Sequence, residues 1–205
     1  MVFFVDPPML YNGITTQVLV YLSGINGGNV TSLGIRPTGT TDPLLYLTTT
    51  YDITKPNQVL AIVPMGLPTG GYDVLVEDAL GCSAELTNGL QVTDSLTLAL
   101  DRIDPPFGMS GQLTGVTLFT ENPLPAGMVG FGNLPRVYLA PHNPGPGDVA
   151  TTMTALGFIN DEKLTGVVPG TLAPGEYDVI VVNPGGEVGL LANGFTVTAN
   201  PSPVI

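Results

Sequence analysis

The stretch Gly70-Gly71-Tyr72-Asp73-Val74-Leu75-Val76 recurs 105 positions later as Gly175-Glu176-Tyr177-Asp178-Val179-Ile180-Val181. Both copies alternate apolar and other residues, which is typical of a β-strand with one buried face. Residues two apart share a face of such a strand. We therefore predict that Tyr72, Val74 and Val76 enter the core, while Asp73, Leu75 and Glu77 occupy the opposite face.

The duplication extends along the whole chain. Near the start, Val5-Asp6-Pro7-Pro8 recurs as Ile103-Asp104-Pro105-Pro106 with an offset of 98 positions. Near the end of each copy, Asn88-Gly89-Leu90-Gln91-Val92-Thr93 recurs as Asn193-Gly194-Phe195-Thr196-Val197-Thr198 with an offset of 105. The chain is therefore an internal repeat, and the repeat determines the architecture.

The change of offset means that the second copy carries about seven extra residues. We expect them around segments 121–127 and 141–147, which are rich in Pro and Gly, because such loops absorb insertions cheaply. The repeat predicts two homologous domains, residues 1–95 and 96–205.

Composition narrows the fold class. The 205 residues include 27 glycines, 20 prolines and 43% hydrophobic residues, but only 11% charged residues. The apolar content is too high for a disordered acidic tail, and the glycines lack the three-residue period of collagen. Lys occurs only at Lys55 and Lys163, which does not fit a helical bundle. A folded all-β chain with many turns remains.

Each copy contains seven or so short alternating runs separated by Gly, Pro, Asn and Asp. This is the pattern of an immunoglobulin-like sandwich, so we predict two tandem immunoglobulin-like β-sandwich domains. The expected strands of the first copy are 2–5, 16–22, 30–35, 44–51, 58–63, 72–77 and 89–92. Those of the second are 98–103, 114–120, 128–131, 137–139, 150–158, 163–168, 177–182 and 195–197.

Several of these positions together resemble a known family. The opening Asp-Pro-Pro, the strand closing on Val168-Pro169, the Tyr177-Asp178 strand followed by Asn183-Pro184-Gly185-Gly186, and the final Phe195-Thr196-Val197 are similar to the IPT/TIG family. These are immunoglobulin-like domains of the plexin and transcription-factor type. The first copy departs from the pattern at Asp78-Ala79-Leu80-Gly81 and at Leu90. The motifs mark turns and core strands, so the resemblance implies a fold rather than an activity.

The net charge of −12 limits the partners. Nucleic-acid binding requires clustered Lys and Arg, so we predict no nucleic-acid partner. No apolar run reaches the length of a membrane span, and we predict no membrane insertion. Calcium bound by loop carboxylates is the one cofactor that the acidity leaves open. We otherwise expect no cofactor.

A catalytic pairing is not evident. His142, the only histidine, lies in a Pro- and Gly-rich stretch typical of a surface turn, with no adjacent Cys or carboxylate for a zinc site. Ser110 lacks the Gly-x-Ser-x-Gly setting of a nucleophile elbow. Cys82 has no neighbouring basic residue to stabilise a thiolate, so we expect it to be buried or inert, and its role stays open.

Acidic and aromatic residues give no stronger site. The pairs Glu77-Asp78, Asp161-Glu162 and Asp101 with Asp104 are expected at solvated turns and edges rather than across one cleft. Tyr11, Tyr46, Tyr51, Phe107 and Tyr138 could form sugar-binding platforms, although core or inter-domain packing is the commoner use of such rings. We predict no catalytic, cofactor-binding or metal-binding residues and no enzymatic activity.

We therefore interpret the sequence as a non-enzymatic structural or adhesive module of a bacterial cell-surface or secreted protein. It would act as a rigid spacer or a protein-interaction unit, with partners or further copies bound through edge strands and loops, and head-to-tail assembly as one variant. The alternative is a carbohydrate-binding accessory module of an extracellular polysaccharide-acting enzyme. Because strand-like sequence begins at Val2, we expect the chain to be a fragment of a longer protein.

Overall fold

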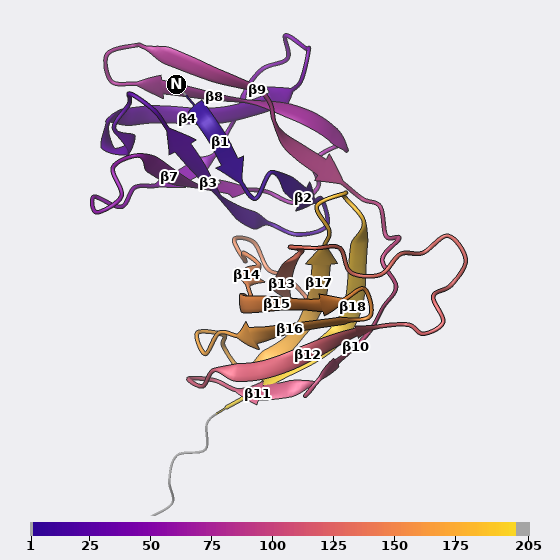
Figure 1. Cartoon of the computed structure of the whole chain (residues 1–205). Helices are drawn as coiled ribbons and strands as arrows, with labels where there is room; N and C mark the ends of the chain where they lie inside the picture. Colours follow the sequence, from indigo (N-terminus) through magenta and orange to yellow (C-terminus); the bar gives the residue numbers. More distant parts are fainter. Residues whose placement is uncertain (1, 200–205) are drawn as a thin grey trace, which may run out of the picture. The chain divides into compact units, whose positions relative to one another are not determined.

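The computed structural model describes residues 2–199 and contains two compact units, Met1–Asp94 and Ser95–Ile205 (Figure 1). The boundary predicted from the repeat lies one residue further along the chain. Both units are all-β, as expected, and each is described here by itself.

The first unit pairs a four-stranded sheet with a five-stranded sheet. The orders are β1-β3-β7-β6 and β2-β9-β8-β4-β5. A single turn of 3-10 helix, Gly27–Asn29, precedes β4. The strands are β1 Val2–Asp6, β2 Met9–Tyr11, β3 Thr16–Leu22, β4 Val30–Pro37, β5 Leu45–Tyr46, β6 Thr48–Thr50, β7 Gln58–Val63, β8 Gly70–Asp78 and β9 Ser83–Thr93.

The second unit repeats this arrangement strand for strand. Its sheets have the orders β10-β12-β16-β15 and β11-β18-β17-β13-β14. The strands are β10 Leu100–Asp104, β11 Phe107–Met109, β12 Thr114–Thr120, β13 Arg136–Pro141, β14 Thr151–Thr152, β15 Thr154–Asn160, β16 Lys163–Val168, β17 Gly175–Val182 and β18 Val188–Thr198.

The topology is that of an immunoglobulin sandwich in both units. The four-stranded sheets follow the ABED order, and the five-stranded sheets extend the CFG order at both edges. The added edge strands β2 and β11 pair in parallel with the final strands β9 and β18. The predicted fold class, two tandem immunoglobulin-like sandwiches, is confirmed.

Most predicted strands are present, and β3, β7, β12 and β16 have the predicted bounds. The segment 128–131 is not a strand and contributes only an isolated bridge between Leu98 and Val129. Two predicted strands, 44–51 and 150–158, are each divided. Leu45–Tyr46 pairs with β4 in one sheet, and Thr48–Thr50 pairs with β7 in the other. Neither segment contains a Pro at the division, and the change of pairing partner depends on strands distant in sequence, which local patterning does not show.

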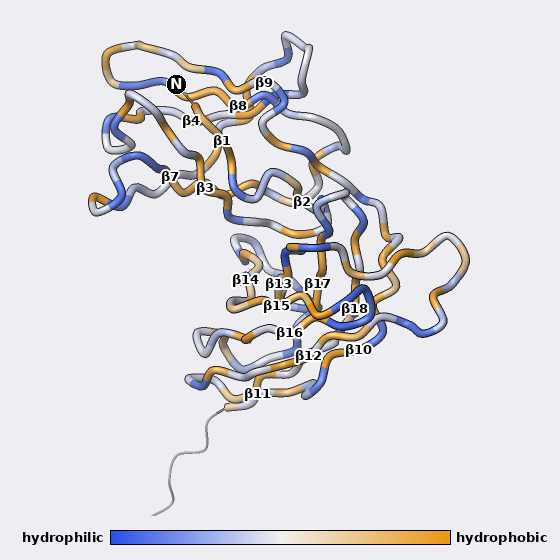
Figure 2. Tube along the Cα trace, viewed as in Figure 1, coloured by the Kyte–Doolittle hydropathy of each residue, from blue (hydrophilic) through white to orange (hydrophobic). Residues whose placement is uncertain are grey.

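Each unit has its own hydrophobic core between its sheets. Apolar segments follow strands such as β1 and β17 in Figure 2, while many connections are hydrophilic. Tyr72, Val74 and Val76 are buried as predicted. Asp73 lies on the opposite face, as predicted, paired with Arg36, but it is buried there as well. In the second unit the fully buried side chains include Phe195, Leu118, Leu139 and Leu164.

A buried tyrosine fixes the same corner in both units. The Tyr72 hydroxyl donates a hydrogen bond of 2.8 Å to the Pro68 carbonyl, and the Tyr177 hydroxyl donates one of 2.8 Å to the Ala173 carbonyl. Such a bond from the first residues of the sixth sandwich strand to the backbone just upstream is the tyrosine corner of immunoglobulin folds. Burial raises the pKa of both hydroxyls.

The extra residues of the second unit lie mainly in one connection. The offset between the units is 98 at Thr16 and Thr114 but 104 at Leu33 and Val137, the residues paired with Val76 and Val181. Six of the extra residues therefore lie between β12 and β13, in the loop 121–135, which includes the predicted segment 121–127. The region around 141–147 contributes little.

The tyrosine corners make a testable contribution to stability. Tyr72→Phe and Tyr177→Phe each remove one hydroxyl that bonds to a backbone carbonyl. Each substitution is expected to lower the free energy of unfolding of its own unit by about 1 kcal/mol. Urea denaturation followed by the NMR signals of each unit measures this, with Tyr46→Phe, at an exposed tyrosine, as the control. Equal stability of all three variants would show that the corner bonds contribute nothing.

Candidate functional site

An aspartate lies where the last two strands of each unit lose their register; Asp73 is buried and Asp178 is half-buried. Tyr72 pairs with Leu90 but Val74 pairs with Leu86, so residues 87–89 bulge opposite Asp73. Asp73 Oδ1 accepts a hydrogen bond of 2.8 Å from the backbone N–H of Asn88. In the second unit Asp178 Oδ1 accepts one of 2.7 Å from Asn193 N–H, at the equivalent bulge.

The Asn-Gly pair at each bulge has a conformational reason. Asn88 and Asn193 have φ values of 53° and 55°, the left-handed region that asparagine tolerates better than most residues. The following glycine leaves room for a leucine: a Cβ on Gly89 would lie 2.6 Å from Leu86 Cδ2. The aspartate then satisfies an amide that has no partner in the ladder.

The two aspartates have different further partners. Asp73 Oδ1 also accepts a 2.7 Å bond from the Thr38 hydroxyl, and Arg36 Nε lies 3.9 Å from Asp73 Oδ2. Burial would raise the pKa of Asp73, but the hydrogen bonds from Asn88 and Thr38 and the charge of Arg36 outweigh it. The pKa of Asp73 is therefore lower than usual.

His142 occupies the corresponding place beside Asp178. Its Nδ1 lies 2.6 Å from Asp178 Oδ1, and its backbone N–H donates to the Glu176 carbonyl. His142 lies in the bend that follows β13 and is partly exposed, as the prediction of a surface turn residue requires. Its carboxylate partner, which the sequence did not indicate, is 36 positions away along the chain. The Asp178 carboxylate is already occupied by Asn193, so the pair links β13 to the β18 bulge.

The other residues with potential reactivity are engaged in local structure. Ser110 donates its hydroxyl hydrogen to the Leu172 carbonyl, and Asp101 pairs with Arg102 at 2.6 Å. Glu162 accepts from the Asn122 amide at 2.9 Å. Cys82 is exposed in the β8–β9 turn, so the expectation of burial is wrong. No group of three or more His, Cys, Asp or Glu side chains suited to a metal ion occurs within residues 2–199.

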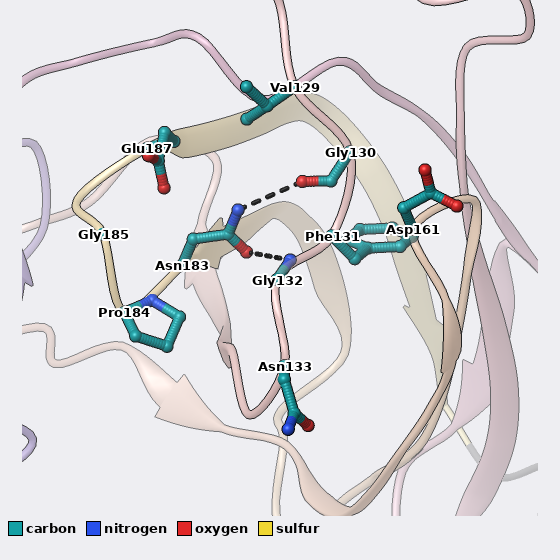
Figure 3. A pocket seen from close by; sticks show the side chains of 10 residues that line it. All are labelled: Val129, Gly130, Phe131, Gly132, Asn133, Asp161, Asn183, Pro184, Gly185 and Glu187. Carbon is teal, nitrogen blue, oxygen red and sulfur yellow. Dashed lines mark hydrogen bonds between the residues drawn. The ribbon is translucent and has the colours of Figure 1, made fainter.

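A pocket of about 490 Å³ opens on the second unit, where the loop 121–135 approaches the β17–β18 turn (Figure 3). Its lining is polar or glycine-rich apart from Val129, Phe131 and Pro184. Asn183, which is buried, braces the pocket wall. Its Oδ1 accepts from Gly132 N–H at 2.8 Å, and its Nδ2 donates to the Gly130 carbonyl at 3.1 Å.

The first unit has a different turn at this point. Asp78 replaces Asn183 and accepts backbone hydrogen bonds from Leu80 and Cys82, both at 2.9 Å, within its own turn. The shorter β3–β4 connection meets this turn through one bond, from Ala79 N–H to the Asn29 carbonyl. In the second unit, the long loop and the Asn-Pro-Gly-Gly turn are therefore joined by the two hydrogen bonds of Asn183, and the first unit has neither feature.

The five aromatic residues considered as platforms have different fates. Tyr138 is 1% exposed, which agrees with the commoner use of such rings in core packing and excludes it as a platform. Tyr11 and Tyr51 are half-buried, and the Tyr51 hydroxyl donates to Asn26 Oδ1 at 2.9 Å. Tyr46 and Phe107 are 66% and 61% exposed. Of the five rings, only those of Tyr46 and Phe107 are exposed enough for a flat ligand to stack on them.

Tyr46 lies on the outer face of the five-stranded sheet of the first unit. The strand register places Tyr46 opposite Gly34. Gly34 pairs with Leu75 on the next strand, and Leu75 pairs with Glu85 on the strand beyond it. Arg36 lies two residues after Gly34 on the same face, and its Nη2 donates to Glu85 Oε2 at 3.1 Å. An exposed ring is thus combined with a fixed donor and acceptor.

The outer face of the four-stranded sheet contains an aromatic pair that sequence reasoning missed. Phe4 and Tyr21 are cross-strand partners with ring centroids 4.1 Å apart. The equivalent pair in the second unit is Arg102 over the Phe119 ring, at 4.0 Å. In the sequence, this pair is visible as an apolar residue at an outward-facing position of each predicted strand, 2–5 and 16–22. Such residues indicate an aromatic pair only when the strand register shows that they lie opposite each other.

Comparisons with known proteins give similar solved structures but no family. No family model matches the chain, and no curated protein matches it. Among solved structures it is similar to the Bacteroides ovatus mixed-linkage glucan utilization locus protein SGBP-B in complex with a mixed-linkage heptasaccharide. The match covers 98% of this chain and 46% of that chain at 17% identity, with a TM-score of 0.34.

Two further structures extend the comparison. The Prevotella bryantii surface glycan-binding protein PbSGBP-B is 13% identical over 93% of this chain and 40% of its own, with a TM-score of 0.32. The tandem Ig repeats of Dlar are 14% identical over 97% of both chains, with a TM-score of 0.42. The chain therefore spans less than half the length of the two surface glycan-binding proteins that it matches. No helix within residues 2–199 is long and apolar enough to cross a membrane.

Acid is expected to destabilise the first unit through Asp73. Its pKa lies below the value of about 3.9 in an unfolded chain, so its contribution is complete above about pH 4 and is lost as the pH falls through the lower folded-state pKa. Asp73→Asn removes this part of the pH dependence. Urea denaturation from pH 2 to 6 tests it, and identical slopes for variant and wild type would contradict the assignment.

Asn183→Ala is expected to loosen the pocket wall. The Gly132 amide and the Gly130 carbonyl lose their partner, which costs about 1–3 kcal/mol in the unfolding free energy of the second unit. Hydrogen exchange of the Gly132 amide should accelerate. Asn133→Ala, at an exposed residue lining the same pocket, is the control and should change stability by less than about 0.5 kcal/mol. Equal effects of both variants would rule out the bracing role.

Proposed function

We propose that this chain is a non-catalytic module of a larger bacterial cell-surface or secreted protein. Its two IPT/TIG-like domains act as a spacer or a protein-interaction unit and work without a cofactor. The observation that carries the proposal is the use of the polar side chains. His142, Asp178 and Ser110, the groups nearest to catalytic chemistry, hold strands and bulges together instead of meeting in a cleft.

The connection between the units supports the spacer role. β9 ends at Thr93, and Ser95 already accepts a hydrogen bond through its carbonyl from Val188 N–H. Leu98 N–H donates to the Val188 carbonyl, so this stretch belongs to the second unit. Only Asp94 separates two folded bodies, whereas a flexible tether contains many residues.

The edges of the sheets support contact with proteins or with further copies. β6, Thr48–Thr50, is a terminal strand of its sheet, and all three of its residues are exposed. Such a strand has one side free to receive another strand, which is a general mode of protein recognition. Head-to-tail assembly through the loops would use the same module in series.

The family assignment within the immunoglobulin-like class rests on the second unit. The Asn183-Pro184-Gly185-Gly186 turn and Phe195 have clear physical roles there, the first as a brace and the second in the core. The first unit departs from the family pattern at the turn that contains Asp78.

A second candidate function, glycan binding as an accessory module, is favoured by one feature, the exposed Tyr46 on the same sheet face as the Arg36–Glu85 ion pair.

Calcium binding is tested simply, because a bound ion that stabilises the fold raises the melting temperature when chelator is replaced by calcium. An unchanged melting temperature is expected.

The spacer role predicts restricted motion between the units. In ¹⁵N relaxation measurements, amides of both units should report a single rotational correlation time, because one residue allows little independent motion. Inserting ten Gly and Ser residues after Asp94 should give two shorter correlation times. Two short times in the unmodified chain would contradict the spacer role.

A further inference from the structure

The outer face around Tyr46 combines an open ring with a glycine that lets the ring lie close to the sheet. Tyr46 is in β5, the last strand of its sheet, and is paired with Gly34. Gly34 is buried, and a Cβ placed on it would lie 3.5 Å from Tyr46 Cδ1. The ring therefore covers the glycine on one side, while two thirds of the residue stays accessible to solvent.

An ion pair lies further across the same sheet face, toward β9. The Arg36 and Glu85 side chains are 26% and 38% exposed, and their 3.1 Å contact fixes the direction of both groups. Leu75, half-buried, lies between Gly34 and Glu85 in the same cross-strand row. From Tyr46 to Glu85 the face therefore passes from an aromatic surface to charged hydrogen-bonding groups.

The charge distribution favours a neutral ligand over a charged one. Arg36 is already balanced by Glu85 and by the buried Asp73, so it offers hydrogen-bond donors without a free positive charge. The whole chain has a net charge of −12, which repels anionic polymers. A neutral ligand with both an apolar face and hydroxyl groups fits this combination.

We infer that this face of the first unit binds a neutral glycan. The sugar chain would lie across the strands from Tyr46 toward Glu85. One pyranose ring would stack its apolar C–H face on Tyr46, and hydroxyls of sugar residues further along would bond to the Arg36 guanidinium and the Glu85 carboxylate. Few, fixed polar groups beside an apolar surface are the usual composition of a small-ligand site.

The second unit provides an internal contrast. The positions equivalent to Tyr46, Gly34 and Leu75 are Thr152, Tyr138 and Ile180. Tyr138 and Ile180 are buried, and Ala140 stands where the first unit has Arg36. The inference therefore assigns one glycan site per chain, in the first unit, and deepens the second candidate function above.

The experiment is native affinity electrophoresis of the full chain in gels containing soluble mixed-linkage β-glucan, xyloglucan or galactomannan, with polygalacturonate as the anionic counterpart. At least one neutral polymer should retard the wild type, and polygalacturonate should not. Tyr46→Ala should weaken the retardation about tenfold or more, whereas Tyr46→Phe, which keeps the ring, should remain within about threefold. Glu85→Gln should weaken it several-fold.

Phe107→Ala is the matched control, because it removes a similarly exposed ring from the second unit and should leave retardation unchanged. An NMR spectrum of each variant checks folding, and Tyr46→Phe with Glu85→Gln keeps the test decisive if Tyr46→Ala unfolds. The inference is overturned if no neutral polymer retards the wild type, or if Tyr46→Ala binds as the wild type does. It is also overturned if Tyr46→Ala changes only self-association in sedimentation. Each of these results leaves the spacer role intact, because ¹⁵N relaxation tests that role separately.

Discussion

The contact on which the rest of each unit depends is the hydrogen bond between an aspartate and the backbone amide of a left-handed asparagine. Asp73 accepts from Asn88, and Asp178 accepts from Asn193. Without it, three residues of the final strand would face the preceding strand with an amide that has no partner in the strand ladder. The bond lets the last strand bulge and resume pairing, so that Leu90 or Phe195 returns to the core.

Around this shared contact the two units have diverged at their surfaces. Thr38 and Arg36 approach Asp73, whereas His142 approaches Asp178. The Arg36 side chain then continues to Glu85, so the polar end of the inferred glycan site is an extension of the same contact. The second unit has instead acquired a longer loop braced by Asn183. The two units therefore share one fold but have different surfaces.

Local patterns predicted the parts of the fold that local forces determine. The alternation at Tyr72, Val74 and Val76 and the bounds of β3 and β16 follow from period-two patterning. The division of 44–51 between two sheets and the partnership of His142 with Asp178 depend on segments distant in sequence. Asp73 follows the alternation rule and lies on the outward face, but it is buried there and accepts the Asn88 amide of the bulge, which alternation alone does not predict. For the same reason the sequence did not indicate the cross-strand row of Tyr46, Gly34, Leu75 and Glu85, because these residues come from four strands.

The account therefore rests on the two aspartate–amide bonds, and native-state hydrogen exchange tests them most directly. The amides of Asn88 and Asn193 lie in bulges outside the strand ladder, where exchange is normally fast. The account predicts that both are protected to the level of neighbouring strand amides, and that Asp73→Ala and Asp178→Ala abolish this protection, each in its own unit. Rapid exchange of both amides in the unmodified chain, with the strands still protected, would contradict it.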